Sequence, residues 1–154
     1  MVSLKNKTKG FTIVELLIVI VVIGILATLV LVTFTGIQQK ARDSKRKTDL
    51  GAVQATLETY YSSNNTYPTK TQLNDVASGG WVATNMKGFD NAALKDPKLP
   101  SASDNAPLAD ATTATQYGYT VTPSGCDGTA TPCTNYTITA TLEGGGTFSK
   151  QSNN

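Results

Sequence analysis

The chain is organised around residues 9–20, which read KGFTIVELLIVI. Apart from one carboxylate, the apolar run that begins here continues to about Ile37, interrupted only by glycine and threonine. A helix needs about 20 residues to cross a bilayer, so the run is long enough to span a membrane. Glu15 is the exception, because a charge at the middle of a membrane costs roughly 2.5–3.5 kcal/mol on insertion scales. This glutamate therefore needs an explanation beyond simple anchoring.

The residues around this glutamate resemble the processing and methylation site of type IV prepilins and pseudopilins. The shared pattern is a short basic leader, a glycine, an aromatic residue, a glutamate at fixed spacing and a long apolar helix. Here Gly10, Phe11 and Glu15 occupy the fixed positions. The resemblance implies that a prepilin peptidase cuts after Gly10, that Phe11 is then N-methylated, and that Glu15 guides subunit assembly. The pattern covers roughly the first third of the chain.

The chemistry of these residues fits that role independently. A helix that is apolar on every side either spans a membrane or is buried in an assembly. Glu15 lies four residues after Phe11, so the two share a helix face. Cleavage at Gly10 would give Phe11 a free amine at the positive end of the helix dipole, and a carboxylate from the same chain or a neighbour would offset it.

Two simpler interpretations remain for this segment. One is an ordinary signal anchor with an incidental glutamate. The other is a cleaved secretory signal peptide, which fits less well because the run exceeds the usual apolar region and no small-x-small site closes it.

The composition limits the function of the chain beyond the leader and the helix. The chain has 154 residues, so one compact exported domain remains. Without the leader's three lysines, Lys+Arg falls from 13 to 10 against 11 Asp+Glu, and a net charge of −1 argues against nucleic acid as a partner. The sequence has no histidine, the commonest general base and metal ligand. We therefore expect neither an enzyme nor a cofactor.

The two cysteines, Cys126 and Cys133, indicate a disulfide. An exported domain sits in an oxidising compartment, where a close pair of cysteines is normally oxidised. Their spacing is not C-x-x-C, and no further cysteine or histidine completes a ligand set. A metal site is therefore not predicted.

The patterns together predict an α+β fold of pilin type, in which a long N-terminal helix packs on a small antiparallel β-sheet. In the second half of the helix, Leu50, Val53, Leu57 and Tyr60 recur at steps of three and four and form a core-facing stripe. The expected regions are a leader (1–10), a hydrophobic transmembrane and assembly helix (11–36), the amphipathic half of that helix (37–63), a variable connecting loop (64–115) and the sheet with its disulfide loop (116–150).

Short sequence patterns predict the secondary structure of the rest of the chain. We expect the long helix to end near Ser62, and the capping-box spacing of Thr69 and Gln72 predicts a short helix to about Ala77. Alternation of apolar residues with threonine predicts strands at 116–122 and 135–142, and a short last strand is expected at 147–149. Trp81 is expected to pack under the connecting loop.

A basic cluster lies between the two halves of the helix. Its members are Lys40, Arg42, Lys45, Arg46 and Lys47. We interpret it as a solvated helix face with interfacial anchors, the alternative being charge pairing with neighbouring heads or with lipid headgroups. The cluster opposes the positive-inside rule, but the prepilin-like motif and the cysteine pair favour a cytoplasmic N-terminus and an external head.

The leading hypothesis is a structural subunit of a type IV pilus-like filament. The resemblance implies these partners: copies of the chain in a helical homopolymer, the prepilin peptidase and N-methyltransferase, an inner-membrane assembly platform and, indirectly, an assembly ATPase. It also implies a single-pass membrane protein before assembly and a surface filament afterwards.

Three alternatives stay open. The first is a major-type pseudopilin of a type II secretion system or a competence pilus subunit; such pseudopilins often bind calcium near the last turn of the sheet, where this chain offers only Glu143. The second is a membrane-anchored binding module. The third is a DNA-binding minor subunit that uses Trp81, Lys87, Lys95 and Lys98, although nearby aspartates cancel most of that charge.

Overall fold

The structure, a computed structural model, describes residues 10–153, without the side chains of Leu31 and Val32. Residues 1–9 of the expected leader lie outside the described residues. Contacts divide the chain into two compact units, Met1–Gln38 and Gln39–Asn154. Their boundary falls inside one continuous helix, α1 (Ile13–Asn64), whose ends lie within two residues of the predicted ones.

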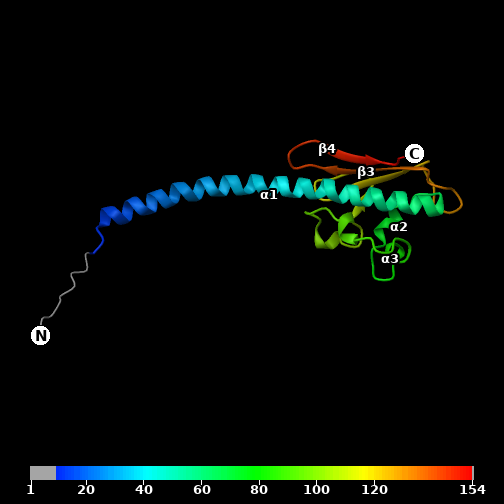
Figure 1. The fold of residues 1–154 in the computed structure, drawn as a ribbon, viewed down its shortest axis with the longest axis horizontal. Coiled ribbons are helices and arrows are strands. Elements are labelled where there is room, and N and C mark those ends of the chain that lie inside the picture. The colour runs from blue at the N-terminus through cyan, green and yellow to red at the C-terminus, as the bar shows by residue number, and fades with distance from the viewer. Residues whose placement is uncertain (1–9, 154) are drawn as a thin grey trace, which may run out of the picture. The chain divides into compact units, whose positions relative to one another are not determined.

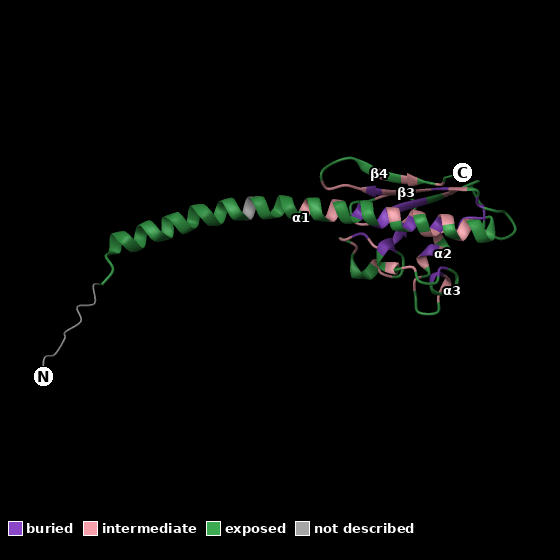
Figure 2. Ribbon diagram, in the orientation of Figure 1, coloured by how far each residue is buried: buried purple, intermediate pink, exposed green. Residues whose placement is uncertain are grey.

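The first unit contains the apolar part of α1. Neither Gly24 nor Gly36 interrupts the helix, although each lowers helix stability by about 1 kcal/mol relative to alanine. Figure 2 shows this part of α1 as exposed along its whole described length. Nothing within the described part of the first unit buries these side chains.

The second unit contains a four-stranded sheet in the order β1-β2-β3-β4. Its strands are β1 (Leu108–Ala109), β2 (Tyr117–Thr122), β3 (Asn135–Thr141) and β4 (Thr147–Gln151). The pairs β2–β3 and β3–β4 are antiparallel, as predicted, but β1 pairs with β2 in parallel. The sheet is therefore mixed: its strands from Tyr117 onward are antiparallel, as predicted, and β1 adds a short parallel strand that the sequence did not indicate.

Contacts with α2 (Lys70–Asn74) hold β1 in position. The side-chain amide of Asn74 donates to the Leu108 carbonyl at 3.0 Å and accepts from the Leu108 amide at 2.8 Å. It therefore makes the two hydrogen bonds that the backbone of a neighbouring strand would make. A strand of two residues shows no alternation of apolar and polar positions. The sequence pattern therefore could not reveal it.

The core of the second unit lies between the sheet and α1. Leu50, Val53 and Leu57 are fully buried, which confirms the predicted stripe, and Tyr60 is half-buried with its ring 5.3 Å from that of Trp81. Figure 1 shows β3 and β4 on one side of the second half of α1 and α2 and α3 on the other. Burial of each such aliphatic side chain contributes about 1.5–3 kcal/mol, so this stripe fixes the helix in the domain.

The connection between α1 and the sheet is more structured than predicted. It holds α2, α3 (Trp81–Asn85), η1 (Asn91–Leu94) and η2 (Ser101–Ser103). The capping box of Thr69 and Gln72 is present, as predicted, but α2 ends at Asn74 rather than near Ala77. The reason is that Asp75, its C-cap, leaves helical geometry and accepts the Trp81 amide at the start of α3.

Candidate functional site

The residues of the prepilin-like motif lie at the start of α1. Gly10, Phe11 and Thr12 precede the helix in non-helical backbone, and the Phe11 side chain is 88% exposed. A β-carbon built on Gly10 would meet nothing within 4 Å. Packing among the described residues therefore gives no reason for a glycine at this position.

Thr12 and Glu15 form a capping box that was not predicted from the sequence. The Glu15 amide donates to Thr12 Oγ1 at 3.2 Å, and the Thr12 amide donates to Glu15 Oε2 at 2.8 Å. The Thr12 hydroxyl also donates to Glu15 Oε2, at 2.7 Å. This reciprocal arrangement satisfies two amides that the first turn would otherwise leave without partners. The T-x-x-E spacing in the sequence was the signal for it.

The two oxygens of Glu15 differ in their environment. Both bonds from Thr12 reach Oε2, and no hydrogen bond from the described residues reaches Oε1. Thr12 therefore fixes the orientation of the carboxylate while leaving one oxygen available as an acceptor.

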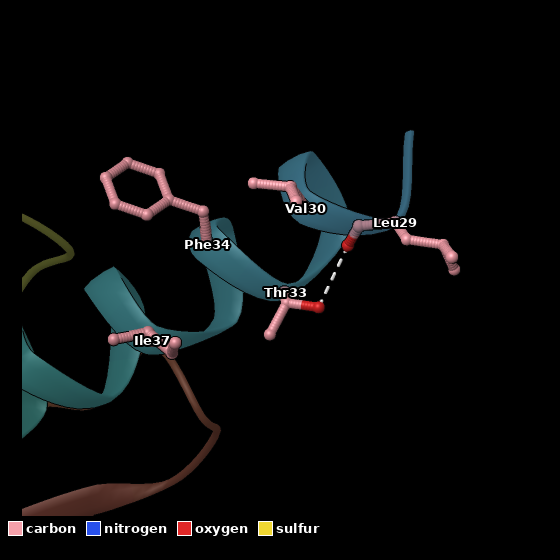
Figure 3. Close-up of a pocket in the computed structure, with 5 residues that line it drawn as sticks. All are labelled: Leu29, Val30, Thr33, Phe34 and Ile37. Atoms are coloured by element: carbon pink, nitrogen blue, oxygen red, sulfur yellow. Dashed lines mark hydrogen bonds between the residues drawn. The ribbon is translucent and has the colours of Figure 1, made fainter. Parts of the chain in front are cut away.

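Between this cap and Ile37, the surface of α1 is apolar all round. Every large hydrophobic side chain whose exposure is described between Phe11 and Ile37 is exposed, by 48% to 88%. Leu29, Val30, Thr33, Phe34 and Ile37 line a shallow depression of 310 Å³ (Figure 3). Thr33 adds little polarity there, because its hydroxyl donates to the Leu29 carbonyl at 2.9 Å.

By length and composition this helix could cross a membrane. The mean hydropathy of its most apolar window is 3.2, and none of that window is buried. An apolar helix without internal contacts needs lipid or other protein chains around it. Membrane anchoring through α1 is the simplest way to satisfy that need.

In the second unit, Arg46 connects α1 to two distant segments. Its side chain is 0% exposed and pairs with Asp43 at 2.8 Å, with Asp96 at 2.7 Å and with Glu143 at 3.0 Å. The contact with Asp96 has two hydrogen bonds, from Nε and Nη2. A planar guanidinium suits such paired contacts, and they compensate for its removal from water.

Glu143, in the β3–β4 turn, forms ion pairs with three basic side chains, one of which is Arg46. It accepts from Arg42 at 2.6 Å and also pairs with Arg46 and with Lys98, the latter at 2.9 Å. The bonds from Arg42, opposed by burial and reinforced by Lys98 and Arg46, hold the pKa of the Glu143 carboxyl well below its usual range. Its carboxylate is thus already neutralised by three cations.

Asp43 fixes the same turn to the helix. Its carboxylate accepts the amides of Glu143 and Gly144 at 2.8 and 2.9 Å. Burial alone would raise the pKa of Asp43, but these two amides and Arg46 together lower it. The cluster therefore joins α1, the segment around Asp96 and the turn in one charge-paired network.

The interpretation of the basic cluster as a solvated helix face is therefore wrong for part of it. Arg46 is buried and Arg42 half-buried in ion pairs, while Lys45 pairs with Asp49 at 2.9 Å. Arg42 and Arg46 reach carboxylates of distant segments, whereas the partner of Lys45 lies on the same helix. Of the five residues in the basic cluster, only Lys40 and Lys47 are exposed without a carboxylate partner among the described residues.

Glu58 of α1 makes a further set of polar contacts. It accepts the hydroxyl of Tyr67 at 2.9 Å and that of Tyr136 at 3.1 Å. These tyrosines pack edge to face with centroids 4.7 Å apart. Glu58 thus orients an aromatic group in the core, which is a structural role.

The cysteines and the carboxylates provide a covalent link but no metal site. Cys126 and Cys133 form a disulfide with a Cα–Cα distance of 5.3 Å in the β2–β3 connection. Among residues 10–153, no group of three or more histidine, cysteine, aspartate or glutamate side chains is arranged to hold a metal ion. The interactions seen among these described side chains are helix capping, charge pairing and a disulfide.

The apolar first half of α1, capped at its first turn by Glu15, has the length and composition of a membrane-anchoring helix. A family profile described as the prokaryotic N-terminal methylation motif matches residues 5–31. Together with similarity to secretion-system and pilin proteins, this match supports a type IV pilin-like family for the chain.

The similar proteins come from two kinds of system. The type II secretion system core protein G of Aeromonas hydrophila is 41% identical over 68 residues, which are 44% of this chain and 48% of that protein. Core protein G of Escherichia coli K12 is 40% identical over 67 residues, 44% of this chain and 46% of that protein. The type IV major pilin protein PilA of Myxococcus xanthus is 34% identical over 61 residues, 40% of this chain and 28% of that protein.

The chain thus spans less than half the length of these relatives in the matched region. No solved structure matches the chain significantly.

Proposed function

We propose that this protein is a structural subunit of a type IV pilus-like filament. In this proposal a prepilin peptidase removes residues 1–10, Phe11 is N-methylated, and the processed chain polymerises through the apolar part of α1. The role is structural rather than catalytic. The observation that carries the proposal is an apolar helix surface without any internal partner among the described residues, most of which lies within the methylation motif matched at residues 5–31.

The geometry around Gly10 supports processing there. A protease binds its substrate as accessible, extended chain, and the Gly10–Phe11 bond lies in exposed backbone before the helix begins. Packing does not explain the glycine. Recognition by a peptidase is then a sufficient reason for it.

The geometry of Glu15 supports a role in assembly. Thr12 holds one carboxylate oxygen, and the other is left to accept the methylated amine of Phe11 from a neighbouring subunit. Inside a filament core of low dielectric, an unpaired amine would be expensive, so this pairing would select one axial register. Apolar contacts alone would not distinguish one register from the next.

The membrane and the assembly machinery complete the proposal. Before assembly the chain would sit in the cytoplasmic membrane with its N-terminus inside and the second unit outside, where the disulfide of Cys126 and Cys133 is stable. An inner-membrane platform, driven indirectly by an ATPase, would extract it, and the filament would reach the cell surface.

Mass spectrometry of the N-terminal peptide tests the proposal. The assembled chain should begin at Phe11 and carry one methyl group on its amine. A Gly10→Leu variant should remain unprocessed in the membrane, whereas Gly36→Ala, in open space within α1, should be processed normally. Retention of residues 1–10 in filaments would contradict the proposal.

A second candidate is a pseudopilin of a type II secretion system, and the similarity to core protein G favours it. Both candidates share processing and helix-mediated assembly. Deletion distinguishes them, because loss of a pilin removes surface filaments whereas loss of a pseudopilin stops secretion of exported proteins.

A further inference from the structure

The second unit begins with a group of basic side chains that reach its surface. We call them the basic collar: Lys40, Arg42, Lys45, Lys47 and Lys98. Lys98 belongs to this group because Glu143 pairs with it and with Arg42. Lys40 and Lys47 are seven residues apart, so they lie on one face of α1, and both are exposed. Within residues 10–153 neither of these two lysines has a carboxylate at ion-pair distance.

In the ion pairs of the collar, the cation is the more exposed partner. The side chain of Lys45 is 51% exposed and that of its partner Asp49 is 8% exposed. Lys98 and Arg42 are 45% and 30% exposed, whereas Glu143, which pairs with both, is 16% exposed. The carboxylates therefore lie beneath the cations. A group that approaches from outside meets ammonium and guanidinium groups first, although much of their charge is balanced below.

The collar follows directly after the apolar run of α1. Lys40 comes three residues after Ile37, which is about 4.5 Å along a helix. The polar headgroup layer of a bilayer is about 5–7 Å thick on each side of the hydrocarbon. When the apolar run occupies the hydrocarbon, Lys40 is therefore at the level of the headgroups. Lys47 is about 10 Å further along the helix, and its flexible stem brings its charge within about a Debye length of that layer.

We infer that the basic collar binds the headgroups of anionic phospholipids in the membrane that holds α1. Basic clusters next to a membrane span are attracted to such lipids, and the helix that carries most of the collar also brings it to them. Nucleic acid is a weaker candidate, because the nearly neutral chain has no strong field for a polyanion. The collar would thus hold the second unit close to the bilayer before assembly.

The inference also gives a reason for cations on this side of the span. A basic cluster beside a span favours a cytoplasmic location, yet the proposed function puts the second unit outside. Contacts with external anionic headgroups would offset that disadvantage. The inference rests on the proposed function in this respect, since it requires α1 to be inserted before the filament forms.

Native mass spectrometry of the full chain in lipid nanodiscs tests the inference. The nanodiscs would contain equal amounts of phosphatidylcholine and phosphatidylglycerol, and the lipids that stay bound to the released chain would be counted. We expect the wild-type chain to retain phosphatidylglycerol in several-fold excess, and Lys40→Gln/Lys47→Gln to lose most of that excess. Lys70→Gln/Lys87→Gln is the matched control, because it removes the same charge from the second unit outside the collar. It should retain lipids as the wild type does.

Acetylation of lysines by a water-soluble reagent locates the contact without any substitution. Lys40 and Lys47 should react several-fold more slowly in nanodiscs of phosphatidylglycerol than in nanodiscs of phosphatidylcholine. Lys87 should react equally in both, since it is exposed and lies outside the collar. Protection of Lys40 and Lys47 in filaments but not in nanodiscs would assign the collar to contacts with another copy and overturn the inference.

The remaining outcomes separate this inference from the proposed function. Retention of the two lipids in equal amounts by the wild type, or an unchanged excess in Lys40→Gln/Lys47→Gln, would overturn the inference. A chain that does not enter nanodiscs would overturn it as well. A chain that is never processed or forms no filament would refute the proposed function, whereas the nanodisc measurements need neither processing nor assembly.

Discussion

The two halves of α1 share one backbone and differ in what covers them. Before Gln38 the large hydrophobic side chains of known exposure are open on every side, whereas after it Leu50, Val53 and Leu57 form a single fully buried stripe. The second half finds its partners in the same chain. The first half has to find them elsewhere, in lipid or in other subunits.

The charged side chains of the two regions also differ in whether their partners lie within the same chain. Glu15 is bonded only to Thr12 of its own helix turn among the described residues, while Arg46 meets carboxylates from three segments of the second unit. A substitution in the first region should therefore affect assembly and leave folding intact. A substitution in the second should affect stability first.

Replacing Glu15 with valine should have the largest effect. Insertion and cleavage should continue, but filaments should be almost absent, because the amine of Phe11 would be buried without a partner at a cost of about 3–5 kcal/mol per subunit. Thr28→Val is the control, since the Thr28 hydroxyl is bonded to the Ile25 carbonyl of its own helix. Immunoblots of membrane and sheared-filament fractions measure both, and a normal filament yield from Glu15→Val would refute the role of the carboxylate.

Replacing Arg46 with methionine should have the largest effect on the second unit. It leaves Asp96 buried without a cation, and breaking a buried pair in this way costs about 3–5 kcal/mol. Lys95→Met is the matched control: the side chains of Lys95 and its partner Asp104 are 34% and 49% exposed, so that pair is worth only about 0–1 kcal/mol. Urea unfolding of a fragment that begins at Ile37 measures the free energy of unfolding of both variants. An equal decrease for the two would contradict the stabilising role of the Arg46 ion pairs.

Reduction of the disulfide should have a smaller effect on the same fragment. Cys126 and Cys133 are separated by 7 positions, and opening so short a loop should cost roughly 2–3 kcal/mol in the chain-entropy model. Melting with and without a reductant tests this, and the double serine variant should show no further response to the reductant. An unchanged melting temperature on reduction would show that the bond does not stabilise the fold.

Mild acid should have the smallest effect. The pKa values of Glu143 and Asp43 are lowered in the folded state, so their contribution to stability is complete well above the unfolded values of about 4. It is lost only as the pH falls below those values toward the folded ones. Melting temperatures between pH 7 and 5 should be constant and decline below about pH 4, and the Arg46→Met variant should decline less. A steep loss near pH 6 would contradict this assignment.

Local patterns predicted much of this fold. The stripe of Leu50, Val53 and Leu57 and the capping box of Thr69 repeat over short distances that a single sequence displays, and the alternation in β3 does so as well. The capping box of Thr12 and Glu15 has an equally local T-x-x-E signal and was not predicted, because the glutamate was interpreted through its charge rather than its hydrogen bonds.

Contacts between distant residues could not be predicted in the same way. Arg46 and Asp96 are 50 positions apart, and nothing in the lysine-rich stretch around Arg46 marks it as buried. The parallel strand β1 depends on Asn74, 34 positions before Leu108. Such pairs become apparent only when the chain is folded, since each residue alone is typical of a solvated surface.

The uniform apolar surface of α1 also has a mechanical consequence. Dispersion contacts between aliphatic side chains resist separation of two helices but offer little resistance to sliding along their axes, since one set of methyl contacts replaces another. In a filament under tension, axial slip would therefore be opposed chiefly by the charge pair at Glu15 and by whatever the heads contribute. Tensile strength would then depend on a few polar groups, and salt or acid would weaken a stretched filament more than a relaxed one.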